Sequence, residues 1–433
     1  MVLKMRKMKD SGIEWIGEIP EGWEIKRLGA ILQERNEVNN PIQTTSILSL
    51  TNNRGVIPYS EKGNQGNKAK DDLTGYKIAH IGDIVLNSMN VIIGSVGLSN
   101  YYGAVSPVYY ILFPRNNIET NIQYYNYLFQ TTAFQQSLRG YGNGILEIRM
   151  RIQMQKLKTV LLPVPTFLEQ SNITVYLDAS LSKLNILLSK TRSSIEEYKK
   201  LKQVVITQAV TKGVRAKREM KDSGVEWIGE IPKEWVIQKI KSISSRINVG
   251  VVIRPSEYFD ENGTVPFLRG INVKEYFISS DNMVYINESS NRILSKSQVH
   301  TDDILIVRDG SIGTSCVVPA EFDGANVVSM VIATPSISCD SRFICYSLNS
   351  DVGKTQFTLT KIGSALTHTS VSAVSDIIVA VPSCAEQKEI ADYLDVKCAE
   401  IDGLIAKKEQ LVKELESYKK SLIYEVVTGK REV

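Results

Sequence analysis

Two long stretches of the chain carry apolar residues at alternating spacings of four and three positions. This spacing places the side chains on one stripe of a helix and is typical of coiled coils. It predicts two long helices, within residues 166–215 and 383–433, that pack through a shared seam. The predicted seam consists of Leu177, Leu181, Leu184, Leu188, Ile195, Tyr198 and Val205 in the first helix and Leu394, Ile401, Ile405, Val412, Leu415 and Leu422 in the second.

Both predicted helices carry the same start and stop signals. Residues 166–169 and 383–386 each follow a proline and fit a capping box, and Gly213 and Gly429 stand where C-terminal caps are expected. A helix of this length spans roughly 60 Å at 1.5 Å per residue. Only a short linker follows the first helix, so the two seams meet only if the helices are antiparallel. The alternative is that each helix is a single amphipathic helix that lies on its own domain.

The segments between the helices show short apolar runs broken by glycine, asparagine and proline. Such runs are typical of strands and turns. Strands are predicted within residues 81–88, 109–114, 302–310 and 375–382, and a helix within 122–138. This pattern indicates an α+β fold, divided into a first domain (1–165), a first helix (166–215), a second domain (216–382) and a second helix (383–433).

The chain repeats itself. The string "MKDSGIEWIGEIP" at residues 8–20 recurs at 220–232 with one change, Ile13 against Val225. "PVPTFLEQSNITVYLD" at 163–178 likewise corresponds to "AVPSCAEQKEIADYLD" at 380–395. Each half therefore has similar ends and a divergent middle. The duplicated opening string is predicted to be a docking segment that packs each domain against the end of the helices.

Composition limits the possible chemistry. The net charge of +4 is too small to indicate nucleic-acid binding alone, and the second domain is acidic, with 16 basic against 19 acidic residues over 216–382. The five cysteines form no CxxC pair, and the three histidines lack metal-ligand spacing. No phosphate-binding loop or nucleophile elbow is present. We therefore expect no catalytic residue, no metal site, no membrane span and a cytoplasmic location.

Two divergent modules, each followed by a similar long helix, resemble the specificity subunits of type I restriction–modification systems. The resemblance covers essentially the whole chain. Its local motifs are "DSGIEWIGEIPEGWEIKRLG" (10–29), "ILSLTNNRGVIP" (47–58), "VPTFLEQSNITVYLD" (164–178), "VPFLRGINV" (265–273), "DDILIVRDGSIGTSCVV" (302–318) and "YKKSLIYEVVTGK" (418–430).

The resemblance implies an architecture and a role. Two globular α+β target-recognition domains, related by a pseudo-two-fold axis, would be separated by two long antiparallel coiled-coil helices. Each domain would read one half of a bipartite, asymmetric site in double-stranded DNA. The helices would set the spacing and bind two modification subunits that use S-adenosylmethionine to methylate adenine. Restriction subunits, which use ATP, would join that complex, and this chain would carry no cofactor and no catalysis.

Base reading favours arginine or lysine for guanine and asparagine or glutamine for adenine, while other polar groups hold the phosphates. Polar loops of both middles supply such side chains, although turns are rich in the same residues. We expect DNA contacts from Asn53, Arg54, Lys68, Lys70, Arg139, Tyr141, Asn143, Arg149 and Arg151 in the first domain and from Arg269, Asn272, Arg308, Ser311, Lys361, Ser364, Thr367 and His368 in the second. For Arg308, an ion pair with Asp303 or Asp309 is the alternative.

Two other functions remain open at this point. A two-headed protein–protein adaptor on a coiled-coil rod would explain the repeat and the acidic second domain without DNA. A hidden nuclease or methyltransferase centre would require acidic residues that come together only in the fold.

Overall fold

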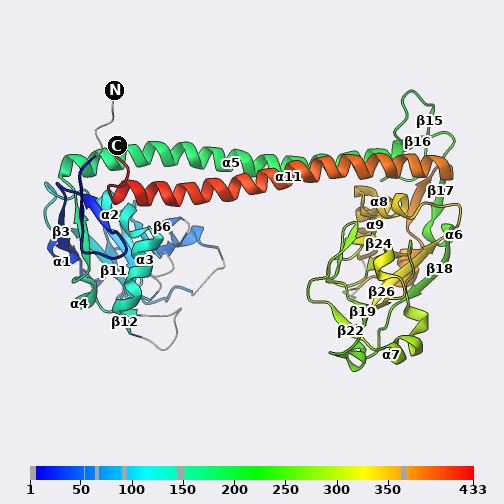
Figure 1. Ribbon diagram of the computed structural model, residues 1–433, viewed down its shortest axis with the longest axis horizontal. Coiled ribbons are helices and arrows are strands. Elements are labelled where there is room, and N and C mark those ends of the chain that lie inside the picture. Colours follow the sequence, from blue (N-terminus) through cyan, green and yellow to red (C-terminus); the bar gives the residue numbers. More distant parts are fainter. Residues whose placement is uncertain (1–5, 53, 64–67, 90–94, 144–150, 362–367) are drawn as a thin grey trace. The chain divides into compact units, whose positions relative to one another are not determined.

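The computed structural model describes residues 6–52, 54–63, 68–89, 95–143, 151–361 and 368–433 (Figure 1). The chain forms two compact units, one of residues up to Thr191 together with Gln410–Val433 and the other of Arg192–Glu409. Each unit contains one α+β domain and part of both long helices. In the described ranges, no helix combines the length and the apolar character needed to cross a membrane.

The first unit is organised around a four-stranded antiparallel sheet with the order β4-β11-β8-β9. Its strands are β4 (Leu32–Glu34), β11 (Tyr109–Pro114), β8 (Ile84–Asn87) and β9 (Val96–Leu98). Three strand pairs surround it: β3 (Glu24–Arg27) with β14 (Leu161–Val164), β5 (Leu48–Thr51) with β6 (Gly55–Pro58), and β7 (Lys77–Ala79) with β10 (Gly103–Val105). A further strand pair joins β12 (Gly142–Asn143) and β13 (Arg151–Ile152), and the short helices include α1 (Leu28–Ile31) and α4 (Met154–Leu157).

The helix predicted within residues 122–138 is two helices. α2 (Ile122–Phe129) and α3 (Thr132–Ser137) are separated at Thr131, whose hydroxyl accepts a hydrogen bond from the amide of Phe134 and caps α3. A threonine in this role satisfies an end amide that a continuous helix would bond internally, so it starts a new helix. Their aromatic side chains, including Tyr124 and Phe129, fill the core of the unit.

The second unit repeats the four-stranded sheet and differs in the elements around it. Its four-stranded antiparallel sheet is β18 (Ser244–Val249), β26 (Met330–Pro335), β23 (Ile304–Val307) and β24 (Ser315–Val317). Its strand pairs are β17 (Val236–Lys239) with β27 (Ile378–Val381) and β20 (Val273–Lys274) with β21 (Phe277–Ile278), and a three-stranded sheet joins β22 (Val284–Ile286), β19 (Val265–Leu268) and β25 (Asn326–Val327). Its short helices are α6 (Ile240–Ile243), α7 (Glu288–Ile293), α8 (Ser341–Asn349), α9 (Asp351–Lys361) and α10 (Val371–Ser375).

The long helices are α5 (Phe167–Lys212) and α11 (Cys384–Val427). In the first unit, the early part of α5 and the late part of α11 lie side by side (Figure 1), and Lys419 Nζ donates to Asn185 Oδ1 at 2.9 Å. In the second unit, Lys202 Nζ contacts Asp402 Oδ2 at 2.7 Å. A residue early in one helix thus meets a residue late in the other, so the helices are antiparallel within each unit. All thirteen predicted seam residues are buried or half-buried, as a helix–helix seam requires.

These two lysine contacts are equivalent. Lys202 and Lys419 are the matching polar interruptions of the predicted seam, and Asp402 and Asn185 are matching positions on the opposite helix. Each lysine head therefore leaves the seam and bonds to the neighbouring helix at one register. Lys408 makes a related contact, with its Nζ 5.6 Å from the centre of the Tyr198 ring. Polar contacts of this kind favour one register of a coiled coil over the others.

The duplicated opening string forms the same small structure twice. β1 (Met8–Asp10) pairs with β2 (Glu18–Pro20), and β15 (Met220–Asp222) pairs with β16 (Glu230–Pro232). In the first copy, Ile16 and Ile19 are buried with Val426, and Tyr424 of α11 donates a hydrogen bond to the carbonyl of Trp15 at 3.0 Å. In the second copy, the equivalent isoleucines pack on the last turns of α5. The predicted docking role of this string is confirmed.

An arrangement of arginine, tryptophan and glutamate that occurs in both units joins the residues flanking the string to the start of the helix that follows each domain. In the first unit, Arg6 and the indole Nε1 of Trp23 both donate to Glu169. Burial raises the pKa of Glu169, but these hydrogen bonds outweigh it and hold the pKa below its ordinary value. Arg218 and Glu386 form the equivalent ion pair beside Trp235. The capping-box glutamate therefore also anchors its domain.

Candidate nucleic-acid interface

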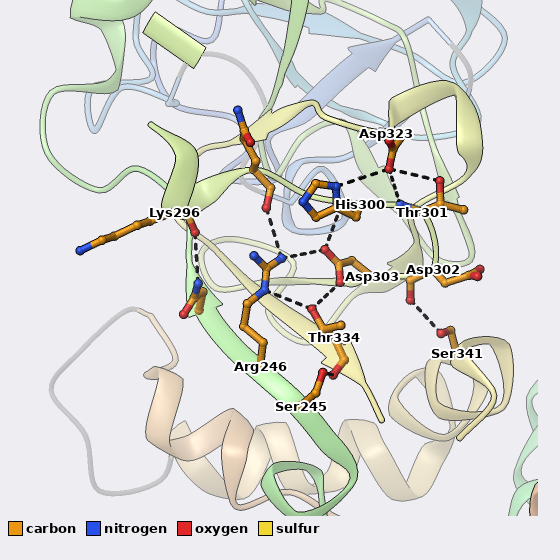
Figure 2. A network of polar contacts seen from close by, with 12 residues as sticks. Ser245, Arg246, Lys296, His300, Thr301, Asp302, Asp303, Asp323, Thr334 and Ser341 are labelled. Atoms are coloured by element: carbon orange, nitrogen blue, oxygen red, sulfur yellow. Dashed lines mark hydrogen bonds and ion pairs between the residues drawn. The ribbon is translucent and has the colours of Figure 1, made fainter. Parts of the chain in front are cut away.

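A pair between a half-buried arginine and a buried aspartate fixes the central strand of each sheet. Asp303 is 1 % exposed and accepts hydrogen bonds from Arg246 Nη2 at 2.9 Å and from the amide of His300 at 2.9 Å. Figure 2 shows this pair, with Thr334 of β26 donating to the same carboxylate. Asp303 immediately precedes β23, so the pair holds the beginning of the strand against β18 and β26.

The first unit contains the same pair. Arg35 contacts Asp83 through Nε at 2.7 Å and Nη2 at 3.0 Å, and the amide of His80 donates to Asp83 at 2.9 Å. The sequence analysis predicts neither pair. The feature that could have indicated them is shared by "HIGDI" (80–84) and "HTDDI" (300–304): in both, a histidine stands three residues before the aspartate that is buried in the fold.

The residues directly after the C-terminal ends of β8 and β23 make equivalent backbone hydrogen bonds. After β8, the carbonyl of Ser88 accepts from the amide of Ile152 at 3.0 Å. After β23, the carbonyl of Arg308 accepts from the amide of Thr369 at 3.1 Å. Each contact brings a late loop of its domain next to the central strand. Ile152 and Thr369 directly follow the predicted residues of 139–151 and 361–368, of which 144–150 and 362–367 lie outside the described residues.

A second loop reaches the same edge in each unit. In the first unit, this loop follows β5, and Asn52 accepts a hydrogen bond from Ser95 Oγ at 2.5 Å. In the second unit, it follows β19, and a Cβ on Gly270 would lie 3.4 Å from Val307 Cγ1. "TNNRG" (51–55) and "RGIN" (269–272), selected separately in the sequence, thus occupy equivalent places. Loops from distant parts of the chain therefore meet at the end of β8 and at the end of β23.

In the second unit, this edge brings four of the predicted DNA contacts into one neighbourhood. Arg308 follows β23, and exposed Ser311 lies in the turn after it. His368 forms a backbone bridge with Asp309, and Arg269 begins the loop that contains Gly270. We refer to residues 269–271, 308–311, 328–329 and 368–369 as the second-unit edge.

In the second unit, one predicted contact needs correction and one alternative is excluded. Asn272 is fully buried, with its amide donating to the carbonyls of Ser279 and Asp281 and its Oδ1 accepting from the amide of Arg269. It closes a loop and is not available to a base. For Arg308, the alternative ion pair with Asp303 or Asp309 is not formed. Its Nε donates instead to the carbonyl of Thr369 at 2.9 Å.

The predicted residues of the first unit are more dispersed. Arg54 is exposed and pairs with Glu61, whereas Lys68 and Lys70 are exposed on a loop held by hydrogen bonds to the hydroxyls of Tyr59 and Tyr76. Arg139 and Arg151 are exposed, and Tyr141 packs partly on the core. For Asn143 and Lys361, the structure gives the backbone, in β12 and at the end of α9. Asn53, Arg149, Ser364 and Thr367 lie outside the described residues.

The chain matches one family model twice. Residues 20–197 and 232–414 each match the type I restriction modification DNA specificity domain. Together these ranges cover most of the chain and include both four-stranded sheets and the first part of each long helix.

Similar proteins extend over the same length. A putative type I restriction enzyme MjaX specificity subunit from Methanocaldococcus jannaschii is 26% identical over 96% of this chain and 95% of its own. The type I restriction enzyme MjaVIII specificity subunit of the same organism is 24% identical over 99% of this chain and 98% of its own.

Solved structures show the same fold. A chain from a structure on complex assembly and conformational transition of the type I R-M system has a TM-score of 0.73 at 14% identity, covering 95% of this chain and 99% of that one. The HsdS subunit from Thermoanaerobacter tengcongensis has a TM-score of 0.54 at 15% identity, covering 95% and 98%. The chain therefore belongs to the type I restriction modification DNA specificity domain family and carries two copies of that domain.

Proposed function

We propose that each domain reads one half of a bipartite, asymmetric site in double-stranded DNA through the edge at the end of its central strand, β8 or β23. The observation that carries this proposal is the equivalence of these edges. Each is built by the same strand and the same two loops, yet Ser88 and Ile152 in one correspond to Arg308 and Thr369 in the other. A shared frame with different side chains at the same place suits two domains that read different sequences.

The long helices are proposed to set the spacing between the two half-sites and to bind two modification subunits. Support comes from the antiparallel pairing within each unit and from apolar side chains outside the seam. Exposed apolar residues on these helices include Val175, Ile186, Leu201, Val204, Val396 and Leu404. Modification subunits bound along the helices would cover these side chains.

The remaining parts of the system are assigned to partner subunits. We propose that modification subunits hold S-adenosylmethionine and methylate adenine, that restriction subunits use ATP, and that this chain holds neither cofactor. It would act without catalysis of its own, in the cytoplasm. Among the described residues, no three histidine, cysteine, aspartate or glutamate side chains gather as a metal site would require.

A mobility-shift titration tests the DNA-reading role. The chain is purified with its modification subunits and titrated with duplex DNA between about 50 and 200 mM salt. A protein that neutralises 6–10 phosphates loses roughly 10³–10⁵-fold in affinity over this range. We expect a loss of this order for specific DNA. Weak binding that does not change with salt would contradict the proposal and favour the protein–protein adaptor.

A further inference from the structure

We propose that Arg308 reads a guanine in the half-site of the second domain, with its two terminal guanidinium nitrogens on the O6 and N7 atoms of that base. This proposal rests on the proposed function, since it names one base contact within it.

The Arg308 side chain is held in one orientation by the neighbouring loop. Its Nε donates to the carbonyl of Thr369 at 2.9 Å, while its own carbonyl accepts from the amide of Thr369 at 3.1 Å. This pair of bonds ties the side chain and the backbone of Arg308 to the same residue. Because Nε is engaged, Nη1 and Nη2 remain as a fork at the end of the side chain. A fork that is already oriented loses little conformational entropy when it binds a planar acceptor.

Neither nearby acidic group balances the charge of Arg308. Asp303 is committed to Arg246 at 2.9 Å, and Asp309 Oδ2 accepts a hydrogen bond from Ser329 Oγ at 3.2 Å. Within the described ranges, Arg308 forms no ion pair, although its side chain is half-buried. A half-buried cation whose acceptor is a single neutral carbonyl is incompletely compensated. An acceptor from outside the chain would complete that compensation.

Two buried polar atoms near Arg308 also lack a hydrogen-bond partner among the described residues. Arg269 Nε and Thr369 Oγ1 are buried and have no partner among the described residues. Both belong to the second-unit edge, whose other members include Gly270, Gly310 and Ser311. Small residues beside an arginine fork leave room for the edge of a base pair to approach. The edge therefore combines unused donors with space for a polar ligand.

Guanine is the base whose chemistry fits this fork. In the major groove it presents two acceptors, N7 and O6, at a spacing that matches two arginine N–H groups. Adenine presents one acceptor and one donor there, so it would leave one N–H of Arg308 unpaired. A phosphate would also accept from Arg308, but a phosphate contact gives no base preference. The two contacts are therefore distinguishable by specificity.

The first domain lacks this contact. Ser88, which corresponds to Arg308, is fully buried, and its Oγ donates to the carbonyl of Val108 at 2.9 Å. A guanine contact by Arg308 would therefore affect one half of the recognition motif only.

The test replaces Arg308 in the complete restriction–modification complex and determines the methylated motif across the host genome. With Arg308→Ala, we expect one G·C pair in one half of the motif to become degenerate, with discrimination lowered roughly 5-fold or more. The other half should be unchanged. Arg308→Lys keeps the charge but loses the planar fork, and it should weaken discrimination at the same pair. Arg308→Lys decides the question if the alanine variant does not fold.

Arg292→Ala is the matched control. Arg292 is exposed on α7. The side-chain amide of its neighbour Asn291 donates to the carbonyl of Gly324. The backbone amide of Gly324 in turn donates to the carbonyl of Val299, which lies shortly before β23. Arg292 therefore belongs to the opposite end of the central strand, and its removal should leave the motif intact. An unchanged motif with Arg308→Ala, even with uniformly weaker methylation, would indicate a phosphate contact and overturn the proposal. Relaxation at an A·T pair would overturn it as well. A wild-type complex without a bipartite motif would instead contradict the proposed function.

Discussion

Replacement of Asp303 by alanine is expected to lower the free energy of unfolding of the second unit by about 3–5 kcal/mol. The carboxylate is buried and accepts from Arg246, from the amide of His300 and from Thr334. Removing it leaves the Arg246 charge without its partner and the other two donors without an acceptor. Breaking such a pair is costly because the half-buried Arg246 stays partly desolvated after its partner is removed.

Asp323→Ala is the control for this prediction. Asp323 lies in the same network in Figure 2, where it accepts from the amide of Thr301 at 2.8 Å, but it is exposed. Because its charge is exposed to solvent, its removal should cost much less than the removal of Asp303. Urea denaturation, followed by a probe in the second unit, would measure both variants. Equal losses for the two aspartates would show that the buried pair does not fix the sheet.

Lengthening both long helices by seven residues should lengthen the spacer of the DNA motif by about three base pairs, since seven helical residues add roughly 10 Å. The insertions are placed after Thr191 in α5 and after Glu409 in α11, where the two units divide. Seven residues preserve the heptad spacing of the seam, so both lysine contacts keep their register. Binding to duplexes with spacers of different length would measure the change.

An insertion in α5 alone is the control for this change. It would shift only one helix, so the contacts of Lys202 with Asp402 and of Lys419 with Asn185 would no longer form together. We expect this variant to lose binding for every spacer length. A double insertion that still prefers the original spacer would show that the helices do not set the spacing.

The helices and the repeat were predictable because their signals are local. Each helix signal depends only on residues close together in the sequence: a capping box, a terminal glycine and apolar residues spaced by four and three. The observed α5 (Phe167–Lys212) accordingly lies within the predicted 166–215. The duplicated string was equally clear. Its docking role followed from its position before each domain.

The arrangement of the candidate interface was not predictable in the same way. The pair of Arg35 and Asp83 spans 48 residues, and the pair of Arg246 and Asp303 spans 57. Contacts at that separation depend on how the strands assemble, which no local pattern specifies. Asn272 illustrates the complementary error. Its amide has the donors and acceptors that suit adenine, but the same groups suit the backbone of a buried loop. Residue type alone does not distinguish these two uses.

The most direct measurement of the central claim is the adenine methylation pattern of a host that carries the intact operon, compared with the same host lacking this chain. The proposed function predicts a two-part methylated motif with a fixed spacer that disappears when the chain is absent and returns with it. Replacing residues 21–165 with the recognition module of a different specificity subunit should change one half of the motif and preserve the other. A pattern that is independent of this chain, or a motif in which both halves change together, would contradict the account.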